Sequence, residues 1–163
     1  MKAVIVYFSK FGNTRRIAEV IGETMGQAGQ TRVVSIEQLA AADLEGVDLV
    51  VMGNPTHAFS VPQAVRSVVA SLPQGVLAGR SVAVFDTTVT FWPLRHLRAS
   101  PKLLRRLRKL GGKPAVPPQT FFVKTRGPQQ PGEVDLLFDG EIERARAWAG
   151  DILSRLGGAA IDK

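Results

Sequence analysis

The chain alternates short apolar runs with longer segments in which apolar residues recur at helical spacing. The runs are nearly continuous, which is typical of strands buried on both faces of a parallel sheet. The second run is the weakest, because it is short and polar at its start. The pattern predicts five strands, over Ala3 to Phe8, Arg32 to Ile36, Asp48 to Gly53, Ser81 to Asp86 and Thr120 to Lys124.

Four of the intervening segments carry an apolar stripe with helical spacing. Pro62 suits the first turn of the second helix, and Ser100 and Pro101 are expected as the cap and first residue of the third. Gly111 and Gly112 are expected to end that third helix. The four stripes are Ile17, Ile21 and Met25; Val65, Val68, Val69 and Leu72; Leu103, Leu107 and Leu110; and Ile142, Ala145, Ala149, Ile152, Leu153 and Leu156.

Strands and helices that alternate along 163 residues predict one doubly wound α/β sandwich. We expect a domain over residues 1–157 and a flexible C-terminal tail over residues 158–163. Ligands of such sheets lie beyond the carboxyl ends of the strands. The expected site is therefore formed by the loops after the first, third and fourth strands, which read SKFGNT, NPTHAFSVP and TTVTFWPL.

The composition limits the chemistry and the compartment. Hydrophobic residues make up 45% of the chain and charged residues 21%, which suits a globular domain with a core. The absence of cysteine excludes disulfides, thiol catalysis and cysteine-ligated metals, so redox chemistry would need an organic cofactor. Too little precedes the first apolar run for a signal peptide, and no apolar stretch is long enough to span a bilayer. We therefore expect a soluble cytoplasmic protein without a membrane span.

The turn SKFGNT joins a strand directly to a helix. Gly12 and the free backbone N–H groups at the start of that helix form a ready anion site, to which Ser9, Asn13 and Thr14 add short polar side chains. The alternative is that Asn13 or Thr14 only caps the helix and Gly12 only turns the chain. Neither a P-loop nor a G-x-G-x-x-G motif is present, because Lys10 precedes the only glycine of the turn.

Three segments resemble the flavodoxin family, and together they extend over nearly the whole chain: S-K-F-G-N-T, G-N-P-T-H from Gly53 to His57, and G-E-I-E-R-A-R-A-W-A. The resemblance implies a three-layer α/β sandwich around a five-stranded parallel sheet of order 2-1-3-4-5, with noncovalent FMN. It places the phosphate at Ser9 to Thr14 and the flavin ring between the loops after the third and fourth strands. The implied cofactor-binding residues are Ser9, Lys10, Phe11, Gly12, Asn13, Thr14, Pro55, Thr56, His57, Ala58, Phe59, Asp86, Thr87, Thr88, Phe91 and Trp92.

The chain departs from the family pattern in two of these loops. Phe11 stands where a hydroxyl residue is common, which removes one donor but leaves the backbone amides. The third loop lacks the tyrosine that many members stack on the flavin, so Trp92 or Phe91 is the candidate for that face. His57 and Phe59 are candidates for the other face, unless that loop is simply a surface loop with one packed aromatic residue.

The end of the fourth strand allows two interpretations. Asp86, Thr87 and Thr88 could contact the pyrimidine edge of the flavin. Asp86 could instead only cap or turn the end of the strand. The sequence leaves both open.

Charge is concentrated around the third of the four expected helices. The chain has 21 basic and 14 acidic residues, for a net charge of +7. The simplest interpretation of the basic run is that it forms the solvent-exposed face of a helix whose leucine face packs on the core. The alternative is a docking surface for an acidic redox partner protein. Nucleic acid fits less well, because only Phe91 and Trp92 lie nearby as stacking residues. The basic run comprises Arg95, Arg98, Lys102, Arg105, Arg106, Arg108, Lys109 and Lys113.

The two histidines of the chain, His57 and His96, form no metal motif.

The sequence favours an FMN-binding electron-transfer protein that needs no catalytic acid or base. One alternative is an NAD(P)H-dependent quinone or FMN reductase on the same fold, although no nicotinamide motif is present. Another is a flavin-free interaction module that uses the basic helix. The segment from Thr125 to Asp139 is long for a connection and could be a lid or a partner contact.

Overall fold

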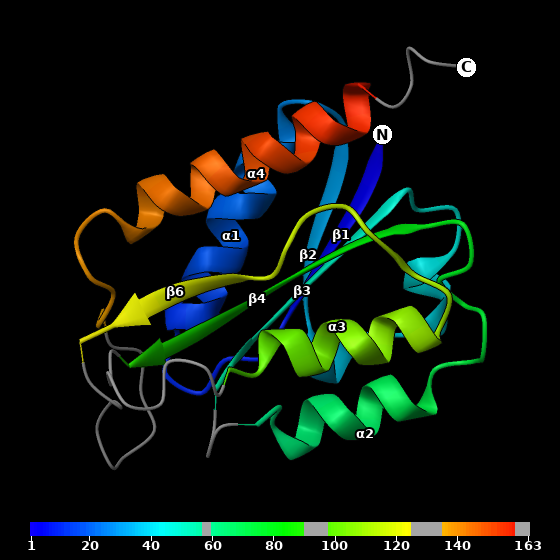
Figure 1. Cartoon of the computed structure of the whole chain (residues 1–163), viewed down its shortest axis with the longest axis horizontal. Helices are drawn as coiled ribbons and strands as arrows, with labels where there is room; N and C mark the ends of the chain where they lie inside the picture. The colour runs from blue at the N-terminus through cyan, green and yellow to red at the C-terminus, as the bar shows by residue number, and fades with distance from the viewer. Residues whose placement is uncertain (57–59, 90–97, 125–134, 159–163) are drawn as a thin grey trace.

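The computed structural model describes residues 1–56, 60–89, 98–124 and 135–158. A twisted sheet lies between two pairs of helices, with α1 and α4 on one face and α2 and α3 on the other (Figure 1). The strands are β1 (Lys2–Tyr7), β2 (Gln30–Ser35), β3 (Leu49–Pro55), β4 (Ser81–Val89), β5 (Lys113–Pro114) and β6 (Gln119–Val123). The helices are α1 (Asn13–Gly26), α2 (Gln63–Ser71), α3 (Ser100–Lys109) and α4 (Glu141–Gly158), with 3-10 turns η1 (Ile36–Gln38) and η2 (Ala41–Leu44).

The strands pair in parallel in the order β2-β1-β3-β4-β5, so the expected order 2-1-3-4-5 is confirmed. The fifth position is divided between two strands. Ser81 and Val82 of β4 pair with β5, and the second half of β4 pairs with β6. Pro117 and Pro118 lie between β5 and β6, and they interrupt the ladder because proline has no N–H to donate. The sequence pattern predicted β6 but missed β5.

Both faces of the sheet are buried, as the apolar runs predicted. Along β1, Val4 and Val6 pack in the core beneath α2 and α3, whereas Ala3 and Ile5 pack in the core beneath α1 and α4. The alternation follows from the twofold repeat of a strand, which sends successive side chains to opposite faces. Burial on both faces fixes the strand register and thereby the positions of the loops.

The helix boundaries differ from the expected ones at two places. Pro62 precedes α2 as its N-cap residue instead of lying in its first turn. Ala99 is the N-cap residue of α3, and Ser100 is already helical. Helix α4 extends through Gly158, and because residues 159–163 lie outside the described parts, the expected flexible tail stays a prediction. None of the described helices is both long and apolar enough to cross a bilayer.

Candidate functional site

The carboxyl ends of β1, β3 and β4 meet at one edge of the sheet, where α1 also begins (Figure 1). Each strand runs parallel to its neighbour, so the loops that follow them emerge side by side. The backbone continues this pairing beyond the strands, because Phe8 N–H donates to Gly53 O at 3.0 Å and Thr56 N–H donates to Thr87 O at 2.9 Å. The three loops predicted from the sequence are therefore neighbours in space.

Helix α1 starts at this edge with an uncapped N-terminus. Gly12 is its N-cap residue and adopts a left-handed conformation with φ 88°, which glycine tolerates and most residues do not. Among the described residues, no side chain caps α1. Its first turn contains no acidic residue, and Arg15 and Arg16 lie there instead. Because a helix N-terminus carries partial positive charge, this turn favours an anion.

The two polar side chains after Gly12 have defined partners. Asn13 is buried, and its Oδ1 accepts a hydrogen bond from Leu136 N–H at 2.9 Å. Thr14 is also buried, and its Oγ1 lies 2.8 Å from Oγ1 of Thr87 at the end of β4. Only one of the two hydroxyls can donate in this pair, so the other keeps its proton for a further acceptor. Neither side chain acts as the helix cap that the sequence offered as an alternative.

Besides Arg98 Nε, directly before α3, two buried polar atoms at this edge have no hydrogen-bond partner within the described parts of the chain. One is Ser9 Oγ, which lies between β1 and α1, and the other is Asn54 Oδ1, near the end of β3. The Nδ2 of Asn54 donates to Pro55 O at 2.9 Å, and the residue is fully buried. Buried polar atoms are normally satisfied, so unpartnered ones at a loop cluster indicate a place where a polar ligand binds.

Asp86 occupies a different position from the other candidates. It is fully buried, and its Oδ2 accepts hydrogen bonds from Ser100 N–H at 2.9 Å and from the Thr56 hydroxyl at 3.1 Å. Its Oδ1 accepts the hydroxyl proton of Thr120 at 2.7 Å. Both oxygens are thus engaged by protein groups, at the start of α3, where a carboxylate is stabilised by the helix dipole. This favours the second interpretation of Asp86, as a residue that holds the end of its strand.

The network around Asp86 joins four elements. The Thr56 hydroxyl also accepts Ala99 N–H at 3.1 Å, and Arg98 Nη1 donates to the Thr120 hydroxyl at 3.2 Å. Together these contacts attach the end of β3 and the start of α3 to β4 and β6. The sequence indicated Thr56 as a cofactor contact and gave no sign of its part in this anchor.

The remaining candidates are distributed as follows. Pro55 and Thr88 are half-buried at the ends of β3 and β4, and Thr88 has Phe122 as its neighbour in β6. The ammonium group of Lys10 lies 5.4 Å from the centre of the Phe11 ring, in the turn before α1. His57, Ala58, Phe59, Phe91 and Trp92 lie outside the described residues, and their expected contacts with the flavin stay predictions.

The edge beyond β6 is covered by residues that the sequence did not identify. Phe122 N–H donates to the buried carboxylate of Glu141 at 3.0 Å, and Arg144 Nη2 donates to Thr120 O at 3.2 Å. Lys124 N–H donates to Leu136 O at 2.7 Å, and Val123 forms an antiparallel bridge with Leu137. These contacts cover the outer edge of β6. They also place Leu136 next to α1, where its N–H donates to Asn13. Residues 125–134 of the long connection lie outside the described parts.

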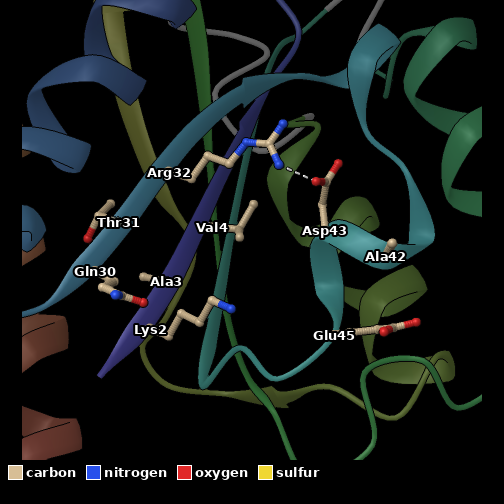
Figure 2. Close-up of a pocket in the computed structure, with 9 residues that line it drawn as sticks. All are labelled: Lys2, Ala3, Val4, Gln30, Thr31, Arg32, Ala42, Asp43 and Glu45. Atoms are coloured by element: carbon tan, nitrogen blue, oxygen red, sulfur yellow. Dashed lines mark hydrogen bonds and ion pairs between the residues drawn. The ribbon is translucent and has the colours of Figure 1, made fainter.

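A hollow lies at the opposite edge of the sheet from the loop cluster, at the start of β1 and β2 (Figure 2). It has a volume of about 260 Å³ and carries Lys2, Arg32, Asp43 and Glu45 on its walls. Arg32 forms an ion pair with Asp43, whose pKa is lowered chiefly by the hydrogen bond from Ala40 N–H and also by the Arg32 charge. Because the pKa of Asp43 is lowered on folding, its ionised carboxylate stabilises the fold at pH values above its ordinary pKa of 3.8. This stabilisation is lost as the pH falls through the lowered pKa. This hollow lies at the amino ends of the strands and the loop cluster at their carboxyl ends, so the two sites are separate. No described group of three histidine or acidic residues is placed to hold a metal.

A model of the flavodoxin domain family matches residues 4–135 of this chain. The match extends from β1 through the three loops and ends one residue before Leu136, whose N–H donates to Asn13. The chain belongs to the flavodoxin domain family. As a flavodoxin-like protein it has the short form of the fold, in which β6 follows β5 closely along the same edge of β4.

Solved flavodoxins have the same architecture. A flavodoxin from the domain Archaea is 21% identical, with a TM-score of 0.71 over 96% of this chain and 99% of that one. Oxidised flavodoxin 2 from Bacillus cereus is 20% identical, with a TM-score of 0.75 over 95% of this chain and 99% of that one. Rubredoxin oxygen:oxidoreductase from Desulfovibrio gigas is 16% identical with a TM-score of 0.70, over 95% of this chain but only 37% of that larger one. At these identities the likenesses establish the fold.

Proposed function

We propose that this flavodoxin-like chain binds FMN without a covalent bond and transfers electrons through it. The observation that carries the proposal is the start of α1, where neither the helix N-terminus nor the buried hydroxyl of Ser9 has a side-chain partner among the described residues. An anion with several acceptor oxygens, such as a phosphate monoester, would satisfy both features at once.

The residues present fit such a group. The backbone N–H groups of the turn from Ser9 to Thr14 would hold the phosphate, and the hydroxyls of Ser9 and the Thr14–Thr87 pair would add donors. Arg15 and Arg16 are exposed in the first turn, where Arg15 pairs with Glu19 at 2.7 Å and Arg16 lies 3.9 Å from Asp135, so the helix N-terminus itself would be the main source of positive potential. Asn54 offers an unpartnered carbonyl oxygen at the end of β3, where a donor of the ligand would be accepted. Phe11 does not remove this site, because the amides of the turn do not depend on its side chain.

FMN, when bound, would supply the redox chemistry by accepting and donating electrons at its ring. The chain would bind and orient it. The network around Asp86 holds Thr56 and the start of α3 in place, so the ends of β3 and β4 would be positioned before the ligand arrives.

A flavin titration of the purified apoprotein tests the proposal. We expect saturable binding of FMN at one site and a yellow complex with flavin absorption. A chain that takes up no flavin would exclude the electron carrier and leave the flavin-free interaction module. Oxidation of NAD(P)H with added quinone would identify the complex as a reductase instead of a carrier.

Replacing Thr14 by valine should weaken FMN binding by about 1 to 2 kcal/mol and leave riboflavin binding nearly unchanged. The expected loss is that of a hydrogen bond to a charged group, which riboflavin, lacking the phosphate, does not make. The measurement is the ratio of the two dissociation constants in each variant, because a general loosening of the site affects both flavins.

Thr14→Ser is the matched control, since it keeps the hydroxyl that lies 2.8 Å from Thr87 Oγ1. We expect its preference for FMN over riboflavin to match that of the original chain. Equal affinities of the unmodified chain for FMN and riboflavin would show that the turn is not a phosphate site.

The fluorescence of Trp92 should fall when FMN binds, because the sequence places this residue in the loop expected to cover the ring. Trp92→Phe should abolish most of the quenching. Trp148 is the control, since it is buried on α4 with its ring centre 6.1 Å from that of Phe85 and 6.3 Å from that of Phe121. If Trp148→Phe removes the quenching instead, the ring position is wrong.

A further inference from the structure

We propose that the exposed face of α3 is the docking surface for an acidic electron-transfer protein. We call this face the α3 surface and define it by Lys102, Arg105, Arg106, Arg108 and Lys109, with Lys113 of β5. The identity of the partner rests on the proposed function, whereas the existence of the surface rests on charge and geometry alone.

The distribution of charge along the chain is uneven. Residues 87–132 contain 10 of the 21 basic residues and none of the 14 acidic ones, so the rest of the chain has 11 basic against 14 acidic residues. The stretch from 49 to 132 contains a single acidic residue, Asp86, which is fully buried. The net charge of +7 therefore arises from one part of the fold, and no carboxylate of that part is exposed to offset it.

The α3 surface is held on a rigid element. Leu103 and Leu107 are fully buried on the opposite side of the helix and pack in the core with α2 and β4. The first turn is anchored through Ser100 N–H to Asp86, and the chain leaves the helix through Gly111 at φ 96°. Among the described residues, Arg105, Arg106, Arg108 and Lys109 form no ion pair. These four cationic groups are thus displayed at fixed backbone positions and are available to an outside partner.

The position of α3 connects this surface to the loop cluster. The helix begins where Ala99 N–H and Ser100 N–H bond to Thr56 and Asp86, at the carboxyl ends of β3 and β4, and runs back along the sheet (Figure 1). At 1.5 Å per residue, Arg106 lies about 9 Å along the axis from Ser100. A protein that covers this helix, at about 800 Å² per partner, would reach the loops that are expected to hold the flavin.

The chemistry of the surface favours a protein partner over a membrane or a nucleic acid. A helix that lies in a bilayer interface needs an exposed apolar face, and the apolar face of α3 is buried in the core. Large hydrophobic residues exposed in the described parts are Met1 and Phe138, neither of them on α3. Single-stranded nucleic acids need stacking platforms, and α3 contains no aromatic residue. Carboxylates on a folded protein match a rigid row of guanidinium and ammonium groups.

The test uses an acidic plant-type [2Fe–2S] ferredoxin as the probe and a basic cytochrome c as the opposite-charge control. Binding to the full chain, with and without FMN, is measured at about 0.02 M and about 0.2 M salt, because screening shortens the reach of exposed charges. We expect the ferredoxin to bind, the cytochrome not to bind, and the ferredoxin affinity to fall at least about tenfold at the higher salt.

Two double variants with equal charge change locate the surface. Arg105→Glu with Arg106→Glu should weaken ferredoxin binding about tenfold or more, and Arg146→Glu with Arg155→Glu on the exposed face of α4 should change it less than about twofold. All four arginines are exposed, and although Arg146 and Arg155 pair with Glu143 at 3.6 Å and Asp151 at 3.1 Å, exposed pairs contribute little, so both variants should unfold at nearly the same urea midpoint as the parent. The salt dependence of the unmodified chain decides the question independently of either variant.

Three results would overturn the surface: no binding of the ferredoxin, an equal loss in both double variants, or tighter binding to phosphatidylserine vesicles or duplex DNA than to the ferredoxin. Ferredoxin binding by a chain that takes up no FMN would overturn the electron carrier and support the surface. FMN uptake without ferredoxin binding would overturn the α3 surface and leave the proposed FMN binding intact.

Discussion

Replacing Asp86 by alanine should lower the free energy of unfolding by about 3 kcal/mol or more. The substitution leaves three donors without an acceptor: the buried Ser100 N–H, the buried Thr120 hydroxyl and the half-buried Thr56 hydroxyl. Each buried unsatisfied group costs about 1 to 3 kcal/mol, and the start of α3 loses its only carboxylate as well. Urea unfolding of the apoprotein measures the change.

Asp86→Asn separates the charge from the hydrogen bonds. The asparagine oxygen can still accept from Ser100 and Thr56, and its NH2 group can donate to the Thr120 hydroxyl, so we expect a loss of only about 1 to 2 kcal/mol. Asp139→Ala is the surface control, because that carboxylate is fully exposed and lies 3.7 Å from Lys124 Nζ. If Asp86→Ala unfolds at the same urea concentration as Asp139→Ala, the buried network does not support the fold.

Replacing Gly53 by alanine should lower the free energy of unfolding by about 2 to 3 kcal/mol. A Cβ at this position in β3 would lie 2.0 Å from Cζ of Phe85, which is far inside the contact distance. The ring cannot withdraw easily, because Phe85 is fully buried and its centre lies 5.8 Å from that of Phe121. Overpacking of a tight core typically costs this much.

A double-mutant cycle tests the cause. Phe85→Leu alone should destabilise the chain by leaving a cavity, whereas Gly53→Ala combined with Phe85→Leu should be more stable than the sum of the single losses predicts. Gly150→Ala is the control, because Gly150 is exposed on α4 and nothing lies within 4 Å of the new Cβ. Gly46→Ala would be a poor control, because Gly46 has φ 63° and alanine would be strained there. Additive losses at Gly53 and Phe85 would rule out the steric explanation.

The sequence by itself determined the architecture, because the signals for it are local. The continuous apolar run from Ala3 to Phe8 requires burial on both faces, and the spacing of Ile17, Ile21 and Met25 requires a helix that packs on one side. Five parallel strands alternating with helices leave few topologies, and all of them gather the loops at the carboxyl ends of the strands. Gly12 at a strand-to-helix turn was likewise readable, since its left-handed conformation is a backbone property of that residue.

Only the tertiary structure decided what individual polar side chains do at that edge. Asp86, Thr56 and Thr88 looked alike as residues near a ligand, yet Asp86 and Thr56 are held by groups 14 to 43 residues away along the chain. The same holds for Asn13, whose oxygen accepts from Leu136, 123 residues later. Gly53 was part of a loop motif in the sequence, and the Phe85 ring that excludes a side chain there belongs to the neighbouring strand. Backbone periodicity acts over a few residues and is visible in one dimension, whereas a hydrogen-bond partner or a steric neighbour is chosen by strand register and packing, which exist only once the chain has folded.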